Sequence, residues 1–323
     1  MNSYLPKSII ICLLMLISGT LAWSQNIDTV KLEIKSDELL DLLVDTTNTK
    51  KEFVYSTFKS SRIVDNQSIE NTAKGTLDFR ISHRFNPVSG GIHDLFGIDG
   101  SSIRLGFDYG LNNAITVGVG RSSLFKEYDG FLKAKVLRQT SKNEHPISIS
   151  YVGGISVTSL PSNQLLGRPL LTSESYPFSN RLFYFNQILL ARKFNNNFSL
   201  QIMPTHIHYN FVNTKKEPND LFALGVGTSI KLTSRTHLNF EYIYQFSKLN
   251  GTVNSLSTSF DIETGGHVFQ LIFSNSLGMT ERTFVGQTTD KWQDMGFRFG
   301  FNISRVFTIV RPNNFENSRN KIW

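Results

Sequence analysis

The chain has 323 residues, a formal net charge of +7, one cysteine, 26 phenylalanines and 10 tyrosines. The single cysteine, Cys12, lies in an N-terminal apolar stretch, so the rest of the chain has no disulfide, thiolate metal site or cysteine nucleophile. The moderate positive charge alone indicates neither nucleic acid nor anionic lipid as a partner, and we expect no nucleic-acid binding.

The first 24 residues have the three parts of a secretory signal peptide. Lys7 supplies the positive charge, residues 9–17 are apolar, and residues 22–24 form a small-residue cleavage site before Gln25. Removal of residues 1–24 leaves a mature chain of charge +6, because Lys7 is their only charged residue. No later segment has the roughly 18 uncharged apolar residues of a membrane-spanning helix.

Residues 25–54 are predicted to be a periplasmic linker, which is our candidate docking segment for a periplasmic partner. Residues 36–44 carry four leucines, and either a short amphipathic helix capped by Ser36 or Asp37 or a linker with one helical turn fits them. Residues 55–73 have strand composition with weak alternation. They fit either an extra hairpin or a plug folded into a barrel lumen, and both alternatives stay open.

From Lys74 onward, apolar and polar residues alternate with period two. In residues 296–309, for example, Phe297, Phe299, Phe301 and Ile303 alternate with polar or small residues. The pattern predicts about twelve strands, within a range of roughly ten to fourteen, most of them near the 9–11 residues that cross a membrane at a tilt.

The connections between these strands alternate in length. Residues 111–113, 195–197, 233–235 and 264–266 are tight turns, whereas residues 85–100, 159–180, 210–220, 247–255 and 277–295 are long. Outer-membrane barrels have short periplasmic turns and long outer loops, and a soluble sandwich has no reason for such alternation. We therefore predict an all-β chain with one transmembrane antiparallel barrel over residues 74–309, both ends periplasmic, and a polar C-terminal tail over residues 310–323.

One predicted strand changes phase at Pro204. Phe198, Leu200 and Ile202 share one face, but Ile207 and Tyr209 lie on the other. Proline is tolerated at bulges, so the sequence predicts a bulge near residues 203–204 that returns Ile207 and Tyr209 to lipid and places His206 and His208 in the lumen.

Several stretches together resemble a known family. They are residues 57–63, 77–85, 102–107, 117–122, 299–305 and, most specifically, Phe-Asp-Ile-Glu-Thr-Gly-Gly-His-Val-Phe-Gln at residues 260–270. The chain is similar to the Bacteroidota β-barrels filed as domain of unknown function 5777, over roughly residues 53–309. The resemblance implies an outer-membrane barrel of a Gram-negative bacterium. It brings no substrate, reaction or catalytic residue to this chain.

Charged side chains on the polar strand faces are the candidate lumen-lining residues. They predict a mostly cationic interior, which either favours small anionic solutes in a narrow channel or braces a closed structural or binding barrel through ion pairs. The candidates are Asp78, Arg80, Arg104, Asp108, Lys133, Lys135, Arg192, Lys231, Glu241 and Arg298.

Other chemistry has weaker sequence support. His206 and His208 are two candidate metal ligands that would need Glu241 or His237 as further ligands, and we predict no metal or other cofactor. No short catalytic motif stands out, so we expect no enzyme, with an outer-membrane hydrolase as the third alternative after a channel and a closed barrel. The expected partners are outer-membrane lipid and, during insertion, the barrel-assembly machinery.

Overall fold

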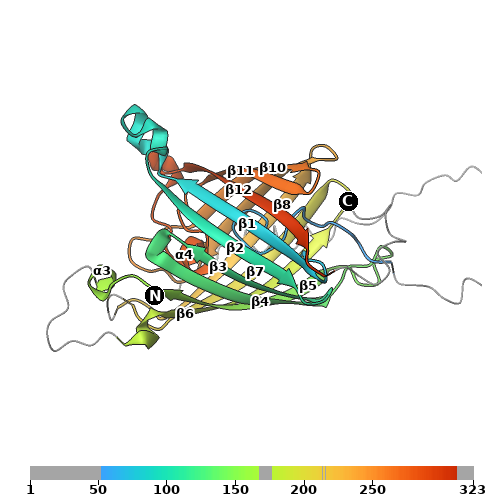
Figure 1. Ribbon diagram of the computed structural model, residues 1–323, viewed down its shortest axis with the longest axis horizontal. Coiled ribbons are helices and arrows are strands. Elements are labelled where there is room, and N and C mark those ends of the chain that lie inside the picture. The colour runs from blue at the N-terminus through green and yellow to red at the C-terminus, as the bar shows by residue number, and fades with distance from the viewer. Residues whose placement is uncertain (1–51, 167–176, 213, 215, 311–323) are drawn as a thin grey trace, which may run out of the picture. The chain divides into compact units, whose positions relative to one another are not determined.

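In the computed structural model of the protein, residues 52–166, 177–212, 214 and 216–310 are described. Within them, antiparallel strands form one closed barrel (Figure 1), which confirms the predicted fold class. The predicted signal peptide, the amphipathic stretch 36–44 and all of the predicted tail except Val310 lie outside the described residues. The strands are β1 (Thr76–Phe85), β2 (Ser101–Gly110), β3 (Ile115–Ser122), β4 (Glu127–Leu137), β5 (Ser148–Thr158), β6 (Leu182–Lys193), β7 (Phe198–Tyr209), β8 (Asp220–Lys231), β9 (Thr236–Gln245), β10 (Ser255–Thr264), β11 (His267–Ser274) and β12 (Arg298–Thr308).

Each strand pairs with its neighbours in the sequence, and β1 closes the ring by pairing with β12. Thr76 stands opposite Thr308 and Arg84 opposite Gly300, so this seam runs almost the full length of both strands. Closure leaves no strand edge with unpaired backbone groups in the ring, as a structure in lipid requires.

The two faces of the barrel wall follow the period-two pattern. In β2, Arg104 and Asp108 are buried on the inner face, whereas Ile103, Leu105 and Phe107 are about two-fifths exposed on the outer face. Large apolar side chains tolerate this exposure because the outer face of a membrane barrel meets hydrocarbon instead of water.

The two ends of the barrel differ in their connections. At the short-turn end lie the connections 111–114, 138–147, 194–197, 232–235 and 265–266, together with the first residue of β1 and the last of β12. At the long-loop end lie residues 86–100, 123–126, 159–181, 210–219, 246–254 and 275–297. The alternation follows the predicted form apart from two connections: residues 123–126 are short for the long-loop end, and residues 138–147 are long for the short-turn end.

Short helices occupy the long-loop connections. They are η1 (Val88–Gly97), η2 (Leu124–Lys126), α3 (Ser162–Leu166), η3 (Phe178–Arg181), α4 (Glu281–Gly286) and η4 (Trp292–Asp294). None of the helices in the described residues has the length and hydropathy to span a membrane. The sequence predicted a long connection over residues 277–295, where α4 forms, and all six residues of α4 are buried.

The bulge predicted near Pro204 is wrong. The β7–β8 register continues without a shift from Met203 opposite Gly225 to Thr205 opposite Ala223. The prediction assumed an aqueous interior along the whole strand. The interior is apolar at this level, so Ile207 and Tyr209 are buried on the inner face, at 0% and 2% exposure.

Candidate functional site

Residues 53–73, here called the inner segment, run inside the barrel ahead of β1. Near its start, the Val54 N–H donates to the Gln139 carbonyl at the short-turn end, and just past its end the Gly75 N–H donates to Gly110 at the same end. Between these anchors the segment turns back on itself, and Arg62 and Gln67 form an antiparallel bridge. The tip of the segment therefore points into the barrel from the short-turn end.

Asp65 lies at the tip of the inner segment, and Arg84 of the barrel wall neutralises its carboxylate. Asp65 accepts from Arg84 Nη2 at 2.6 Å and from Ser257 Oγ at 3.2 Å. Arg84 and Asp65 are 0% and 1% exposed at the side chain. Removing a carboxylate from water is costly unless it is paired and hydrogen-bonded, and this pair meets both conditions.

The backbone of the tip is satisfied by side chains of the wall. Glu241 accepts hydrogen bonds from the Val64 and Asn66 N–H groups, both buried, with Oε2 distances of 3.3 and 3.1 Å. Gln270 donates to the Ile63 carbonyl at 2.9 Å, and Asn302 donates to the Val64 carbonyl at 3.2 Å. Irregular backbone at membrane depth is tolerated where protein groups replace water in this way.

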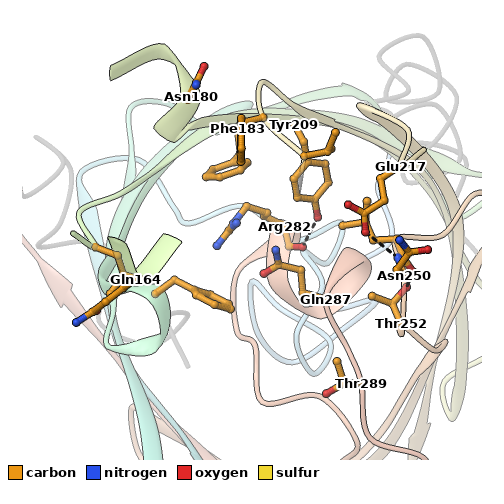
Figure 2. Close-up of a pocket in the computed structure, with 15 residues that line it drawn as sticks. Gln164, Asn180, Phe183, Tyr209, Glu217, Asn250, Thr252, Arg282, Gln287 and Thr289 are labelled. Atoms are coloured by element: carbon orange, nitrogen blue, oxygen red, sulfur yellow. Dashed lines mark hydrogen bonds between the residues drawn. The ribbon is translucent and has the colours of Figure 1, made fainter. Parts of the chain in front are cut away.

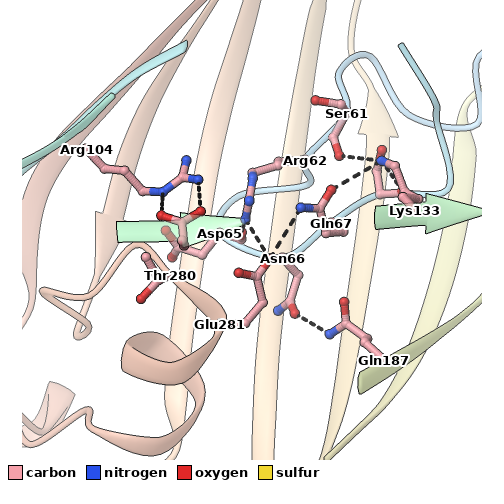
Figure 3. Close-up of polar contacts among 12 residues, drawn as sticks. Ser61, Arg62, Asp65, Asn66, Gln67, Arg104, Lys133, Gln187, Thr280 and Glu281 are labelled. Atoms are coloured by element: carbon pink, nitrogen blue, oxygen red, sulfur yellow. Dashed lines mark hydrogen bonds and ion pairs between the residues drawn. The ribbon is translucent and has the colours of Figure 1, made fainter. Parts of the chain in front are cut away.

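Lys133 holds the middle of the segment. Its Nζ lies within 3.3 Å of three backbone carbonyls and of Gln67 Oε1, the shortest of these contacts being 2.6 Å to the Glu70 carbonyl. Figure 3 shows Lys133 reaching towards Ser61 and Gln67 from the wall. Lys133 of β4 therefore contacts the inner segment both before its turn, at Ser61, and after it, at Ser68 and Glu70.

α4 enters the barrel from the opposite end. All six of its residues are buried, and Phe284 and Val285 join one apolar cluster with the inner segment and the inner wall. Arg282 Nε donates to Glu127 Oε2 at 3.0 Å, and Tyr209 donates to the Arg282 carbonyl at 3.0 Å. The last long connection is therefore anchored inside the ring.

The inner segment and α4 meet through Glu281. Its Oε1 accepts from Arg62 Nη1 at 3.0 Å and from Gln67 Nε2 at 3.3 Å (Figure 3). All three side chains are buried. Elements that enter from the two ends of the barrel are thus joined by one charge pair.

Together these elements fill the lumen. One inner-face residue from each strand around the ring is at most 5% exposed: Asp78, Arg104, Thr116, Lys133, Ser150, Gln187, Gln201, Ser229, Glu241, Ser257, Gln270 and Asn302. In this structure solvent barely reaches these inward side chains.

Nine of the predicted lumen-lining residues lie on the inner face and one does not. The inner-face residues are Asp78, Arg80, Arg104, Asp108, Lys133, Lys135, Lys231, Glu241 and Arg298. Arg192 shares the outward parity of Tyr184 and Ile188, and its guanidinium lies 5.2 Å from the Phe194 ring centroid. It sits at the end of β6, where a cation on the outer face reaches the membrane interface.

The interior is also less cationic than the sequence predicted. Arg80 pairs with Asp78 at 3.0 Å, and Arg104 pairs with Asp129, where Nε to Oδ1 is 2.9 Å. Arg298 pairs with Asp290 of the last long connection. Sequence reasoning omitted several inward groups that balance the charge or hold the segment: Arg84, Glu127, Asp129, Asp261 and Glu263. Their inward parity was readable from the alternation, but their partners were not.

The predicted histidine pair faces outward. His206 Nε2 and His208 Nδ1 lie 2.9 and 2.8 Å from Asp220 Oδ1 on the outer face, because β7 has no bulge. Glu241 and His237, the further ligands considered, lie on the inner face of β9 and cannot share an ion with them. Across the described part of the chain, no group of three or more His, Cys, Asp or Glu side chains is placed to hold a metal ion.

A cavity of about 320 Å³ opens at the long-loop end (Figure 2). Arg282 forms part of its lining, with its guanidinium 4.0 Å from the Phe183 ring centroid and 4.9 Å from that of Phe125. Glu217 accepts from the Asn250 N–H at 3.0 Å at the other side of the cavity. Aromatic, amide and charged side chains thus line the cavity, and Arg282, Gln287 and Thr289 of the last long connection form part of the lining.

The wall glycines have a structural role that fits this filling. A Cβ at Gly227 would lie 2.5 Å from Ile63 Cδ1 of the inner segment. The space beside Gly227 is therefore occupied by the inner segment.

Three solved structures are among those to which this chain is similar. A KdgM porin in complex with disordered oligogalacturonate is 10% identical with a TM-score of 0.43, covering 72% of this chain and 99% of that one. A NanC porin is 8% identical with a TM-score of 0.46, covering 72% and 100%. Omp33 of Acinetobacter baumannii is 8% identical with a TM-score of 0.39, covering 72% and 99%. A comparison with curated protein sequences gives no match.

One family model covers most of the chain. The model described as membrane bound beta barrel domain matches residues 58–307, which include the tip of the inner segment and nearly the whole ring of strands. The chain belongs to this family of membrane-bound β-barrel domains, DUF5777.

Proposed function

We propose that the protein is an outer-membrane channel held closed by its inner segment, and that it passes small hydrophilic solutes when the segment leaves the lumen. The observation that carries the proposal is that the ring of strands is complete without the segment. The bridges of residues 53–74 to the strands and turns are isolated, such as Phe53 to Thr140 and Lys74 to Gly110. Withdrawal would therefore break side-chain contacts and isolated backbone bridges, and leave every ladder between strands intact.

The contacts that hold the segment are polar in large part, and this favours reversible release. Asp65, Lys133 and Glu241 would regain water in an opened lumen, which offsets part of the cost of losing their partners. The exposed lumen would carry charges of both signs, so it suits small hydrophilic solutes. The anion preference predicted from the sequence stays a proposal.

Planar-bilayer conductance tests this function. The mature chain and a variant lacking residues 25–51 are expected to be silent, because both keep the inner segment. A variant lacking residues 25–72 is expected to give steady single-channel current. The control is that all three migrate as folded, heat-modifiable barrels on a gel.

Silence from the folded 25–72 deletion would contradict the channel. It would favour the second candidate, a closed structural or binding barrel. The observations that favour this candidate are the apolar cluster inside the barrel and the cavity at the long-loop end. A periplasmic partner for residues 25–54 also stays a prediction.

A further inference from the structure

Four adjacent strands place a row of basic and hydroxyl side chains on the inner face at the short-turn end. Lys193 of β6 stands opposite Ser199 of β7, and Ser199 stands opposite Ser229 of β8. Lys231, two residues beyond Ser229, stands opposite His237 of β9. All five residues have inward parity. The strand registers therefore gather these groups without any assumption about loops.

The inner segment adds a third lysine to this row. Lys59 lies with Lys193, Lys231 and His237 around one pocket of about 70 Å³, and none of the residues that line it is Asp or Glu. Glu263 lies 2.6 Å from Lys59 Nζ and pairs with that lysine, which leaves the Lys193 and Lys231 ammonium groups without an ion pair. The pocket therefore holds an excess of positive charge at one mouth of the barrel.

Two donors in this pocket have no protein partner. Within the described residues, the Lys231 side chain forms no hydrogen bond or ion pair, and Lys193 Nζ donates only to two backbone carbonyls of the inner segment, at 2.9 and 3.2 Å. His237 Nδ1 lies 3.3 Å from Ser229 Oγ, whereas its Nε2 is buried and unpaired. Like charges and an orphaned buried nitrogen are each unfavourable, and an anion between them would relieve both.

We propose that this pocket binds a small oxyanion, with inorganic phosphate as the type ligand, between Lys59 of the inner segment and Lys193, Lys231 and His237 of the wall. Lysine ammonium groups act as point charges for phosphate, and Ser199 and Ser229 line the pocket with hydroxyl donors. Its volume is about that of two liquid waters, which admits one compact anion and excludes an oligomeric one.

A bound anion would also favour the closed form of the proposed channel. Since it contacts both the segment and the wall, it binds the closed barrel more tightly than the open one and shifts the population towards closure. This second statement rests on the proposed channel function, whereas the binding site does not.

Calorimetric titration of the mature full-length protein in nonionic detergent at low salt tests the site, with sodium phosphate as the probe and sulfate and acetate as further arms. We expect saturable phosphate binding that weakens at least about tenfold in Lys231→Gln, because a charge-assisted contact is lost, and that Lys231→Arg retains. Lys248→Gln is the matched control, because it removes the same charge from an exposed position at the long-loop end.

The outcomes separate the site from the channel. No phosphate binding, or equal weakening by Lys231→Gln and Lys248→Gln, would overturn the site and leave the conductance result for the 25–72 deletion untouched. Phosphate binding together with a silent deletion variant would leave the site standing and overturn the channel. For the effect on closure, phosphate is expected to slow maleimide labelling of an Asn66→Cys reporter, and an unchanged rate would overturn that effect.

Discussion

At the scale of single residues, the packing of the inner segment depends on a few buried charges whose partners lie far away in the sequence. Arg84 is the clearest case, because it is fully buried and its Nη2 holds the Asp65 carboxylate while its Nη1 lies 3.0 Å from Asn302 Oδ1. Losing one partner of a buried pair leaves the other charge uncompensated, which costs about 3–5 kcal/mol.

Arg84→Ala should therefore release the inner segment. The chain's single cysteine, Cys12, precedes the predicted mature start, so Asn66→Cys gives one reporter thiol at the buried tip. Maleimide labelling of that thiol should accelerate more than a hundredfold in Arg84→Ala, which corresponds to about 3 kcal/mol. Arg121→Ala, an exposed arginine on the outer face, should leave the rate unchanged. A slow rate in both variants would remove the Arg84–Asp65 pair from the closure.

The same scale shows what sequence alone can assign. Parity placed Arg104, Lys133 and Glu241 on the inner face, because alternation depends only on neighbours in the strand. It misplaced Arg192, which lies where the strand meets the interface and a cation tolerates the outer face. The partner of Arg104 is Asp129 of β4, whereas Lys133 and Glu241 find their partners in the inner segment, and no local pattern encodes those distances.

At the scale of elements, α4 shows how a connection becomes part of the interior. Thr280 and Thr283 form a capping box at its start, and Phe284 is fully buried in the apolar cluster. The inner face near Ile207 is apolar because it receives this helix. The only sign of this helix in the sequence was the phase change in β7. A bulge or an apolar interior could each explain that change, and the sequence prediction used the bulge.

Phe284→Ala should loosen the last long connection and leave the ring of strands closed. Truncating a buried Phe costs about 3–5 kcal/mol, and here that cost falls on docking of the connection. Trypsin cleavage after Arg282, protected by burial in the native chain, should become fast in detergent-solubilised Phe284→Ala. Phe96→Ala changes an exposed ring in the first long connection and serves as the control. Persistent protection of Arg282 would mean that α4 is held by its polar contacts instead.

At the scale of the whole molecule, we expect the ring of strands to fold without the inner segment, and the segment to add to its stability. The inner segment buries Phe58, Ile63, Val64 and Ile69, and each fully buried apolar side chain contributes about 1.5–3 kcal/mol. The variant lacking residues 25–72 should still migrate as a folded barrel, but its gel shift on heating should occur about 10 °C or more below that of the full mature chain. The variant lacking residues 25–51 should shift with the full chain. Equal transition temperatures for all three would show that the segment adds nothing to the stability of the ring.

The strand ring was largely predictable and its contents were not. Period two and the alternation of connection lengths are local properties, so strand number, order and faces followed from them. Whether residues 55–73 form an extra hairpin or enter the lumen depends on contacts with β1, β4 and β9, which lie tens to hundreds of residues away.

The return path of the inner segment has a mechanical consequence. Both arms of its turn reach the short-turn end, where Phe53 bridges Thr140 and Lys74 bridges Gly110. Tension applied to Phe53 from that end would load the contacts one after another, from the Lys193 carbonyl bonds inward to the Asp65 tip, in the manner of unzipping rather than shear. A pull from the short-turn side would therefore break the contacts in sequence, whereas a push on the tip from the other side would strain all of the contacts at once.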